Sequence, residues 1–126
     1  MKRIIGIVLA ILLLSACSQQ DYEVRTFSYA QDYIDYHEYI ENAMRPDPEG
    51  QRRVLFMNSA KAVEIAKKYC AFGNAEASVG YDSEADMYRV IFIQAFPMDG
   101  YVVYATGGVT VYLDGDGIVL MVTYGE

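Results

Sequence analysis

The feature that most constrains the fold is a pair of strand-like segments joined by an Asp-Gly turn. VTVYL, residues 109–113, and IVLMVTY, residues 118–124, are rich in the β-branched and aromatic residues that suit pleated strands. Between them lies DGDG, residues 114–117, and Asp-Gly accepts the positive φ angles that tight turns require. The pattern predicts a β-hairpin.

The alternative interpretation of DGDG is a calcium loop, and ligand spacing separates the two. An EF-hand loop needs oxygen ligands at alternate positions and a glutamate at the twelfth. Counting from Asp114, Asp116 occupies the third position. The fifth, seventh and twelfth positions lack a carboxylate, and they hold Ile118, Leu120 and Gly125. We therefore expect Asp114 and Asp116 to form a turn, and we expect no metal site.

Two further strands are expected before this hairpin. MYRVIFIQAF, residues 87–96, is nearly apolar on both faces, as in a central strand that is covered on each side. YVVYAT, residues 101–106, follows a turn at residues 97–100. Gly107 and Gly108 then suit a bulge, a bend or a new turn.

Two helices are expected in the first half of the chain. Residues 28–44 have apolar positions at helical spacing, with Ser28 as N-cap and an end before Pro46. Residues 58–73 form the second, which Gly73 closes. The order predicts an α+β fold: two helices followed by a three- to four-stranded antiparallel sheet, with a helix packed on the sheet.

Tyrosines lie along one face of the first expected helix. Tyr29, Tyr33 and Tyr36 follow steps of three and four. Tyrosine has an apolar body and a hydroxyl that reaches water, so such a stripe is either a packing surface or a partner-binding surface. Packing is the commoner case, and the three tyrosines are the candidate partner-binding residues.

The N-terminal segment has the parts of a secretory signal peptide. Lys2 and Arg3 precede an apolar run, residues 4–14, which at eleven residues is shorter than the roughly 20 that span a bilayer. Leu-Ser-Ala then precedes Cys17, which resembles the bacterial lipobox. That resemblance implies removal of residues 1–16 and acylation of Cys17, which anchors the protein in the cell envelope on a bacterial membrane. An ordinary signal peptide with a chance cysteine is the alternative.

The mature chain would consist of a tether, residues 17–27, and a single α+β domain, residues 28–126. Loss of Lys2 and Arg3 changes the formal net charge from -7 to -9. So acidic a chain repels phosphate backbones, which argues against nucleic-acid binding. A basic protein partner would suit it, although charge can also serve solubility alone.

The chain has few groups that carry catalysis. His37 is the only histidine, and with Cys17 lipidated Cys70 is the only thiol, so no internal disulfide is available. Motifs of nucleophilic hydrolases, zinc proteases and phosphate-binding loops are absent from the sequence. We expect no enzyme, no catalytic residue and no cofactor.

Residues 60–126 resemble the immunity-protein family with a nuclear-transport-factor-2-like fold, found beside bacterial polymorphic toxins. The resemblance rests on AVEIAKKY before Phe72-Gly73, the YRV strand, the GGV that opens a strand, and the DGI of the last turn. The family-like part is residues 58–126. Family members often have tryptophan on the central strand, where this chain has Tyr88.

A second resemblance is to the PepSY family, whose small secreted domains are implicated in restraining peptidases. TVYLDGDGIVLMV fits the hairpin that ends that unit. Both resemblances imply a binding protein with a protein partner, a cognate toxin or a peptidase, that acts by occlusion. A structural envelope lipoprotein without a dedicated target is the third interpretation. The immunity family is favoured because of Gly107-Gly108 and Gly125, which a generic hairpin does not require.

Overall fold

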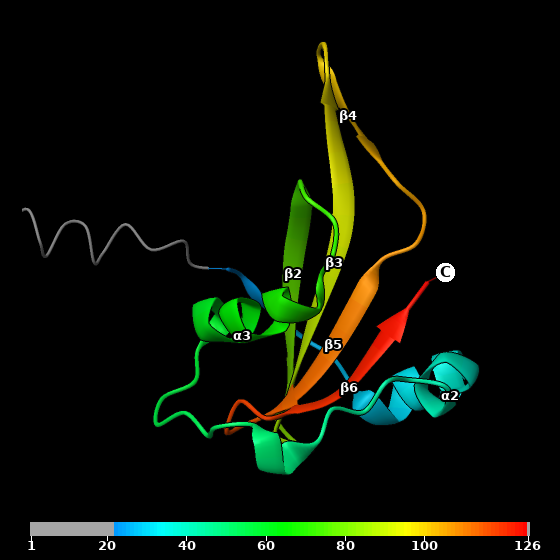
Figure 1. Cartoon of the computed structure of the whole chain (residues 1–126). Coiled ribbons are helices and arrows are strands. Elements are labelled where there is room, and N and C mark those ends of the chain that lie inside the picture. The colour runs from blue at the N-terminus through cyan, green and yellow to red at the C-terminus, as the bar shows by residue number, and fades with distance from the viewer. Residues whose placement is uncertain (1–21, 126) are drawn as a thin grey trace, which may run out of the picture.

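The computed structural model describes residues 22–125, which form an α+β fold with two α-helices and a six-stranded mixed sheet (Figure 1). The elements follow one another along the chain as β1 (Val24–Thr26), α2 (Tyr29–Glu41), the 3-10 turn η1 (Pro48–Gly50), α3 (Ser59–Ala66), the 3-10 turn η2 (Lys67–Tyr69), β2 (Ala75–Asp82), β3 (Met87–Met98), β4 (Tyr101–Tyr104), β5 (Val109–Asp114) and β6 (Val119–Tyr124). The expected signal peptide and Cys17 lie outside the described residues.

The sheet has the strand order β1-β2-β3-β5-β6, and β4 pairs with the far end of β3. All neighbours are antiparallel except β1 and β2, which run parallel. The central strand β3 pairs with β2 from Met87↔Asp82 to Gln94↔Ala75 and with β5 from Met87↔Asp114 to Phe92↔Val109. Strand β3 therefore joins the two halves of the sheet and fixes the alignment of β2 relative to β5.

The expected α+β fold class is confirmed. The expected sheet of three or four antiparallel strands is wrong in detail, because the sheet has six strands and β1 runs parallel to β2. The sequence pattern did not predict β2, whose segment AEASVGYD has few β-branched residues and alternates weakly. Strand β1 lies inside the segment that was expected to be a tether, residues 17–27. Phe27, directly after β1, is buried. These residues therefore belong to the folded unit.

Helix α2 is shorter than expected and has a kink. Ser28 caps its start, because the Ser28 side chain accepts a hydrogen bond from the Gln31 N–H. Non-helical backbone angles at Tyr36 mark the kink. After Glu41 the chain becomes extended, and Met44 forms an antiparallel bridge with Val122 of β6.

Helix α3 begins at Ser59, directly after its cap residue Asn58, and ends earlier than Gly73. The Asn58 side chain accepts from the Lys61 N–H at 2.8 Å. The α-helix stops at Ala66 and continues as one 3-10 turn to Tyr69. Its apolar face is short and consists of small side chains, which lets the helix approach the sheet closely.

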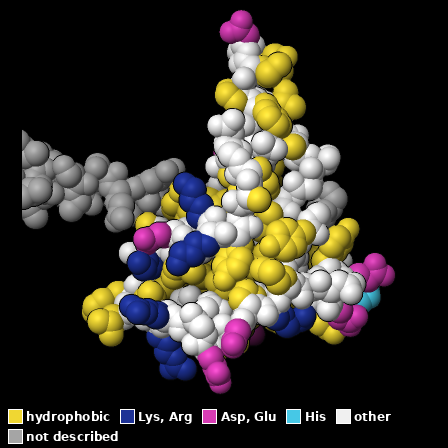
Figure 2. Space-filling model, viewed as in Figure 1, with side chains coloured by type: hydrophobic (Ala, Val, Ile, Leu, Met, Phe, Trp, Pro, Cys, Tyr) yellow, Lys and Arg dark blue, Asp and Glu magenta, His cyan; other side chains and the backbone are white. Residues whose placement is uncertain are grey.

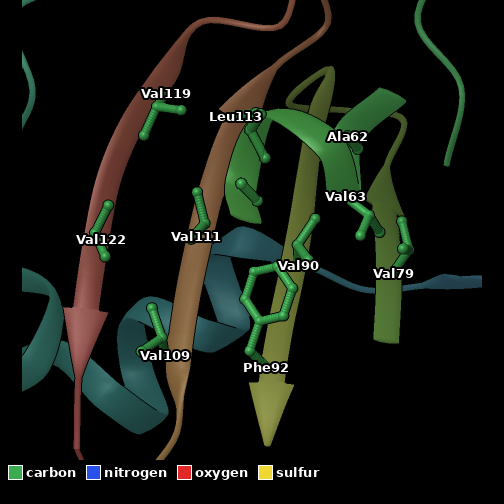
Figure 3. Close-up of a cluster of buried hydrophobic side chains, with 11 residues drawn as sticks. Ala62, Val63, Val79, Val90, Phe92, Val109, Val111, Leu113, Val119 and Val122 are labelled. Atoms are coloured by element: carbon green, nitrogen blue, oxygen red, sulfur yellow. The ribbon is translucent and has the colours of Figure 1, made fainter. Parts of the chain in front are cut away.

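The two helices pack against opposite faces of the sheet. Ala62, Val63 and Ala66 of α3 lie against a face composed mainly of valines, shown in Figure 3. On the other face a smaller cluster joins Ile40 of α2 to the sheet, and its remaining buried members are Phe27, Met87, Tyr112 and Met121. Removal of this apolar surface from water is the main stabilising term for both layers.

Beyond Gln94, β3 leaves the body of the sheet and pairs with β4 alone. We call this two-stranded projection, residues 95–104, the arm (Figure 1). Apolar side chains line it in Figure 2, and six of them are between 41 and 60% exposed, namely Phe96, Met98, Tyr101, Val102, Val103 and Tyr104. The arm contains one charged residue, Asp99, in the turn at its tip.

Candidate functional site

A pocket of about 440 Å³ lies between α2 and the sheet. Its floor is the sheet face that carries Arg89 of β3 and Tyr112 of β5. Tyr36 and Tyr39 of α2 form one wall, and residues 105–108 form another. This volume falls within the range of about 300 to 1,000 Å³ that is usual for ligand pockets.

A hydrogen-bonded cluster of three side chains lies at the base of this pocket. Arg89 Nη1 donates to both carboxylate oxygens of Asp32, at 2.9 and 2.7 Å. The Tyr112 hydroxyl donates to Asp32 Oδ2 at 2.9 Å. Arg89 and Tyr112 are register partners on adjacent strands, so the sheet itself holds the two donors side by side. Asp32 is only 7% exposed, and its pairing with Arg89 offsets the desolvation of both charges.

The Arg89 guanidinium is further fixed by its surroundings. It lies over the Phe27 ring, with 4.4 Å between its central carbon and the ring centroid, which is a favourable cation–π distance. Its Nε is buried and has no hydrogen-bond partner among the described residues. The pair is therefore rigid and almost neutral as a unit, which suits it to shaping a pocket more than to attracting a free anion.

Electrostatics keep the Tyr112 hydroxyl protonated. Burial, followed by the negative charge of Asp32, raises the pKa of Tyr112 far above its ordinary value of 10.0. The hydroxyl consequently remains a donor to Asp32 through the physiological pH range. The Tyr112 phenol is therefore a weaker acid than an exposed tyrosine.

A second carboxylate sets the position of α2. Asp82, at the end of β2, accepts a hydrogen bond of 2.8 Å from the Tyr29 N–H at the first turn of α2. It also accepts from the N–H groups of Glu84 and Ala85 in the turn before β3. These bonds, the Tyr29 bond foremost, lower the pKa of Asp82. The Asp82 side chain thus connects the turn between β2 and β3 to the first turn of α2, the helix that forms the pocket wall.

The three candidate tyrosines separate in the structure. Tyr29 is half-buried, and its ring packs edge-on against Tyr112 at 5.6 Å between centroids. Tyr33 is 44% exposed, and its hydroxyl donates to Glu41. Tyr36 is exposed and lines the pocket together with Tyr39. We call Tyr36 and Tyr39 the tyrosine rim.

Sequence reasoning missed the charged members of the site. The buried residues of α2 are Asp32 and Ile40, two turns apart on one face, and the tyrosines are not among them. Arg89 gave a usable signal, because residues 87–113 contain no other charge except Asp99. A lone arginine in a central strand requires a buried acid, and Asp32 supplies it.

The DGDG segment forms the predicted hairpin turn between β5 and β6. Asp114 Oδ1 accepts from the N–H groups of Asp116 and Ile118, at 2.9 and 3.0 Å. Gly117 has a φ of 83°, which a residue with a side chain rarely adopts. The Asp114 carboxylate is therefore engaged by the turn backbone.

The other candidate groups lie apart from this pocket. His37 is exposed on α2 and does not line it. Cys70 is a partly buried free thiol near the Phe72 carbonyl, at 3.6 Å. Among the described residues, no group of three or more metal-ligating side chains lies together.

No family model, curated protein or solved structure matches this chain. None of the helices within residues 22–125 is long and apolar enough to cross a bilayer.

Proposed function

We propose that this protein is a lipid-anchored binding protein of the bacterial cell envelope, and that it is an immunity protein that neutralises a toxin by occlusion. The observation that supports this proposal best is the pocket beside α2 with its tyrosine rim. A pocket edged by exposed aromatic side chains is the arrangement in which protein interfaces concentrate binding energy.

The pocket would accept one side chain of the partner, and the tyrosine rim would pack around it. Tyr36 and Tyr39 are each 42% exposed, so they offer apolar area before any partner arrives. Tyrosine loses little conformational entropy on binding because it has two rotatable bonds. Burial of such anchors typically dominates the affinity of an interface.

Preorganisation favours the same face. The Asp32–Arg89 pair and the Asp82–Tyr29 bond fix α2 on the sheet before binding, so its position does not have to be ordered by the partner. Binding to a rigid face retains more of the contact energy as affinity. The acidic net charge would speed encounter with a basic partner.

The compartment restricts the target. A protein anchored through Cys17 outside the cytoplasm protects against a toxin that acts in, or passes through, the envelope. A cytosolic nuclease is a poor partner for it. The PepSY-like interpretation shares the anchor and the binding mode but takes a secreted peptidase as its target.

The test pairs this chain with the toxin encoded beside its gene, directed to the periplasm or cell surface. The exported lipidated form should rescue growth, and a form retained in the cytoplasm by deletion of residues 2–16 should not. Rescue should saturate at equal amounts of the two proteins, because binding without chemistry is stoichiometric.

Substitution then locates the binding face. Tyr36→Ala combined with Tyr39→Ala should weaken complex formation by more than about 30-fold, in line with the loss of two aromatic anchors. Phe56→Ala is the matched control, since Phe56 is 86% exposed and does not line the pocket. If the exported, folded protein forms no complex with any product of the adjacent genes, the immunity proposal is wrong. If a complex forms but tolerates both tyrosine substitutions, the face assigned here is wrong.

A further inference from the structure

We infer that two copies of this chain pair through the outer edge of β4, so that the two arms form a continuous four-stranded sheet. This inference concerns the arm and does not depend on the toxin proposal.

The chain covers its other long edge with its own residues. At β6, Met44 N–H donates to the Val122 carbonyl and Val122 N–H donates to the Met44 carbonyl, at 2.9 and 2.8 Å. The Gln51 side chain accepts from the Val119 N–H at 2.7 Å and donates to the Val119 carbonyl at 3.0 Å. Coverage of this kind keeps an edge strand from pairing with another molecule.

The arm has two edges, and one of them is blocked by proline. Ala95 N–H donates away from β4, to the Asn74 carbonyl at 2.8 Å. Backbone groups alternate in direction along a strand, so the nitrogen of Pro97 also points away from β4. Proline has no N–H, which removes the donor that a strand added on the β3 side would need.

The β4 edge has no such protection. Tyr104 and Val102 are the register partners of Ala95 and Pro97, so their N–H and carbonyl groups point away from β3. All four residues of β4 are exposed, and the strand contains no proline, lysine or other charge. Two unpaired donor–acceptor sets, two residues apart, therefore face outward.

This edge is complementary to itself. An antiparallel copy related by a two-fold axis at Val103 sets Val102 of each chain opposite Tyr104 of the other. Each of these two pairs would exchange two backbone hydrogen bonds, and each sets an aromatic side chain beside a β-branched one, a favourable cross-strand pair. In a two-fold pairing, the β4 edge of one copy binds the β4 edge of the other. No free β4 edge then remains, so assembly stops at the dimer.

Charge favours a second copy at the arm although the whole chain is acidic. Residues 90–113 contain only one charged residue, Asp99. Asp99 lies in the hairpin turn, four positions from Val103, so an antiparallel pairing places the two carboxylates at opposite ends of the paired strands. The arm projects from the body (Figure 2). In an antiparallel pairing of two arms, the two acidic bodies would therefore lie at opposite ends of the paired strands.

The first test measures mass. The full chain, extracted from membranes in detergent, should sediment as a dimer with a concentration-dependent dissociation. Val102→Pro removes an outward N–H without removing a β3–β4 hydrogen bond, so it should raise the dissociation constant more than about tenfold. Val102→Thr keeps that N–H and should remain dimeric. A wild-type chain that is monomeric at every concentration, or open-ended aggregates, would overturn the inference.

The second test reads the register in cells. In a Cys70→Ser background, Val103→Cys should form a disulfide between copies on mild oxidation, since residues opposite each other in a non-hydrogen-bonded pair lie about 4.5 Å apart at Cα. Met98→Cys is the control on the other strand of the arm, where Met98 is 52% exposed against 43% for Val103, and it should cross-link at least tenfold more slowly. Equal rates for the two variants would show that the arms do not pair at the β4 edge.

Discussion

Asp32 on α2 accepts two hydrogen bonds from a single guanidinium nitrogen of Arg89, which lies 57 positions later in the sequence. The pair fastens the helix to the central strand, and the Tyr112 hydroxyl completes it. This contact holds α2 in a fixed position on the sheet, although most of the helix surface is exposed to solvent.

Replacement of Arg89 should lower the free energy of unfolding more than replacement of an exposed charged residue. Arg89→Ala leaves Asp32 buried without a counter-charge, and breaking such a pair costs about 3 kcal/mol, the lower end of the usual range because Arg89 is partly exposed. Denaturant titration of the free energy of unfolding measures it. Arg53→Ala is the control, since Arg53 is 80% exposed and its ion pair with Asp116 spans 3.7 Å, and a change of less than about 0.5 kcal/mol is expected. Equal effects would contradict a structural role for Asp32–Arg89.

Alkaline pH should weaken the fold through Tyr112. Folding raises the pKa of this phenol, so its contribution is complete below the ordinary value of 10.0 and is lost as pH rises toward the raised pKa. Stability of the wild type should therefore fall above about pH 10 more steeply than that of Tyr112→Phe. Other tyrosines with raised pKa values are present in both the wild type and Tyr112→Phe. The difference between the two pH–stability profiles therefore reports on Tyr112 alone. Parallel pH profiles would refute the assignment.

The DGDG turn should be insensitive to calcium. Its Asp114 carboxylate already accepts two backbone bonds, and Asp114→Ala should lower stability by about 1 kcal/mol. Melting temperature should be the same in chelator and in millimolar calcium, whereas a native-state ligand at 100 times its dissociation constant would add about 2.7 kcal/mol. A clear rise in calcium would restore the metal interpretation.

Membrane retention should depend on Cys17. Cys17→Ala removes the thiol that the lipobox-like pattern marks for acylation, so the variant should lose a metabolically incorporated fatty-acid label and leave the membrane fraction. Cys70→Ala retains Cys17 and should keep the label. Label that persists on Cys17→Ala would refute lipidation at this position.

Local patterns predicted the local structures well. The Asp-Gly hairpin of β5 and β6 and the Ser28 cap depend on neighbours within a few residues, and both were predicted. Strand β2 escaped prediction because AEASVGYD owes its conformation to pairing with β3 and β1, which is a tertiary effect.

The site was harder to predict because its members are far apart in the sequence. Helical spacing drew attention to the tyrosines, yet the inward position two turns before Ile40 belongs to Asp32. Nothing local to Asp32 distinguishes it from a solvated acid, since its partners Arg89 and Tyr112 lie 57 and 80 residues later. Tyr36, where α2 kinks, lines the pocket, and helical spacing alone does not predict the kink.

The bond between Asp82 and the Tyr29 N–H has a consequence for the order of folding. Asp82 also closes the turn that leads into β3, a contact over two or three residues that forms on the microsecond scale of hairpins. The start of α2 lies 53 positions away, so it must wait for a much larger loop to close. The β2–β3 hairpin should therefore form early in folding, and α2 should dock on the sheet late. Substitutions in α2 should then increase the unfolding rate and leave the folding rate nearly unchanged.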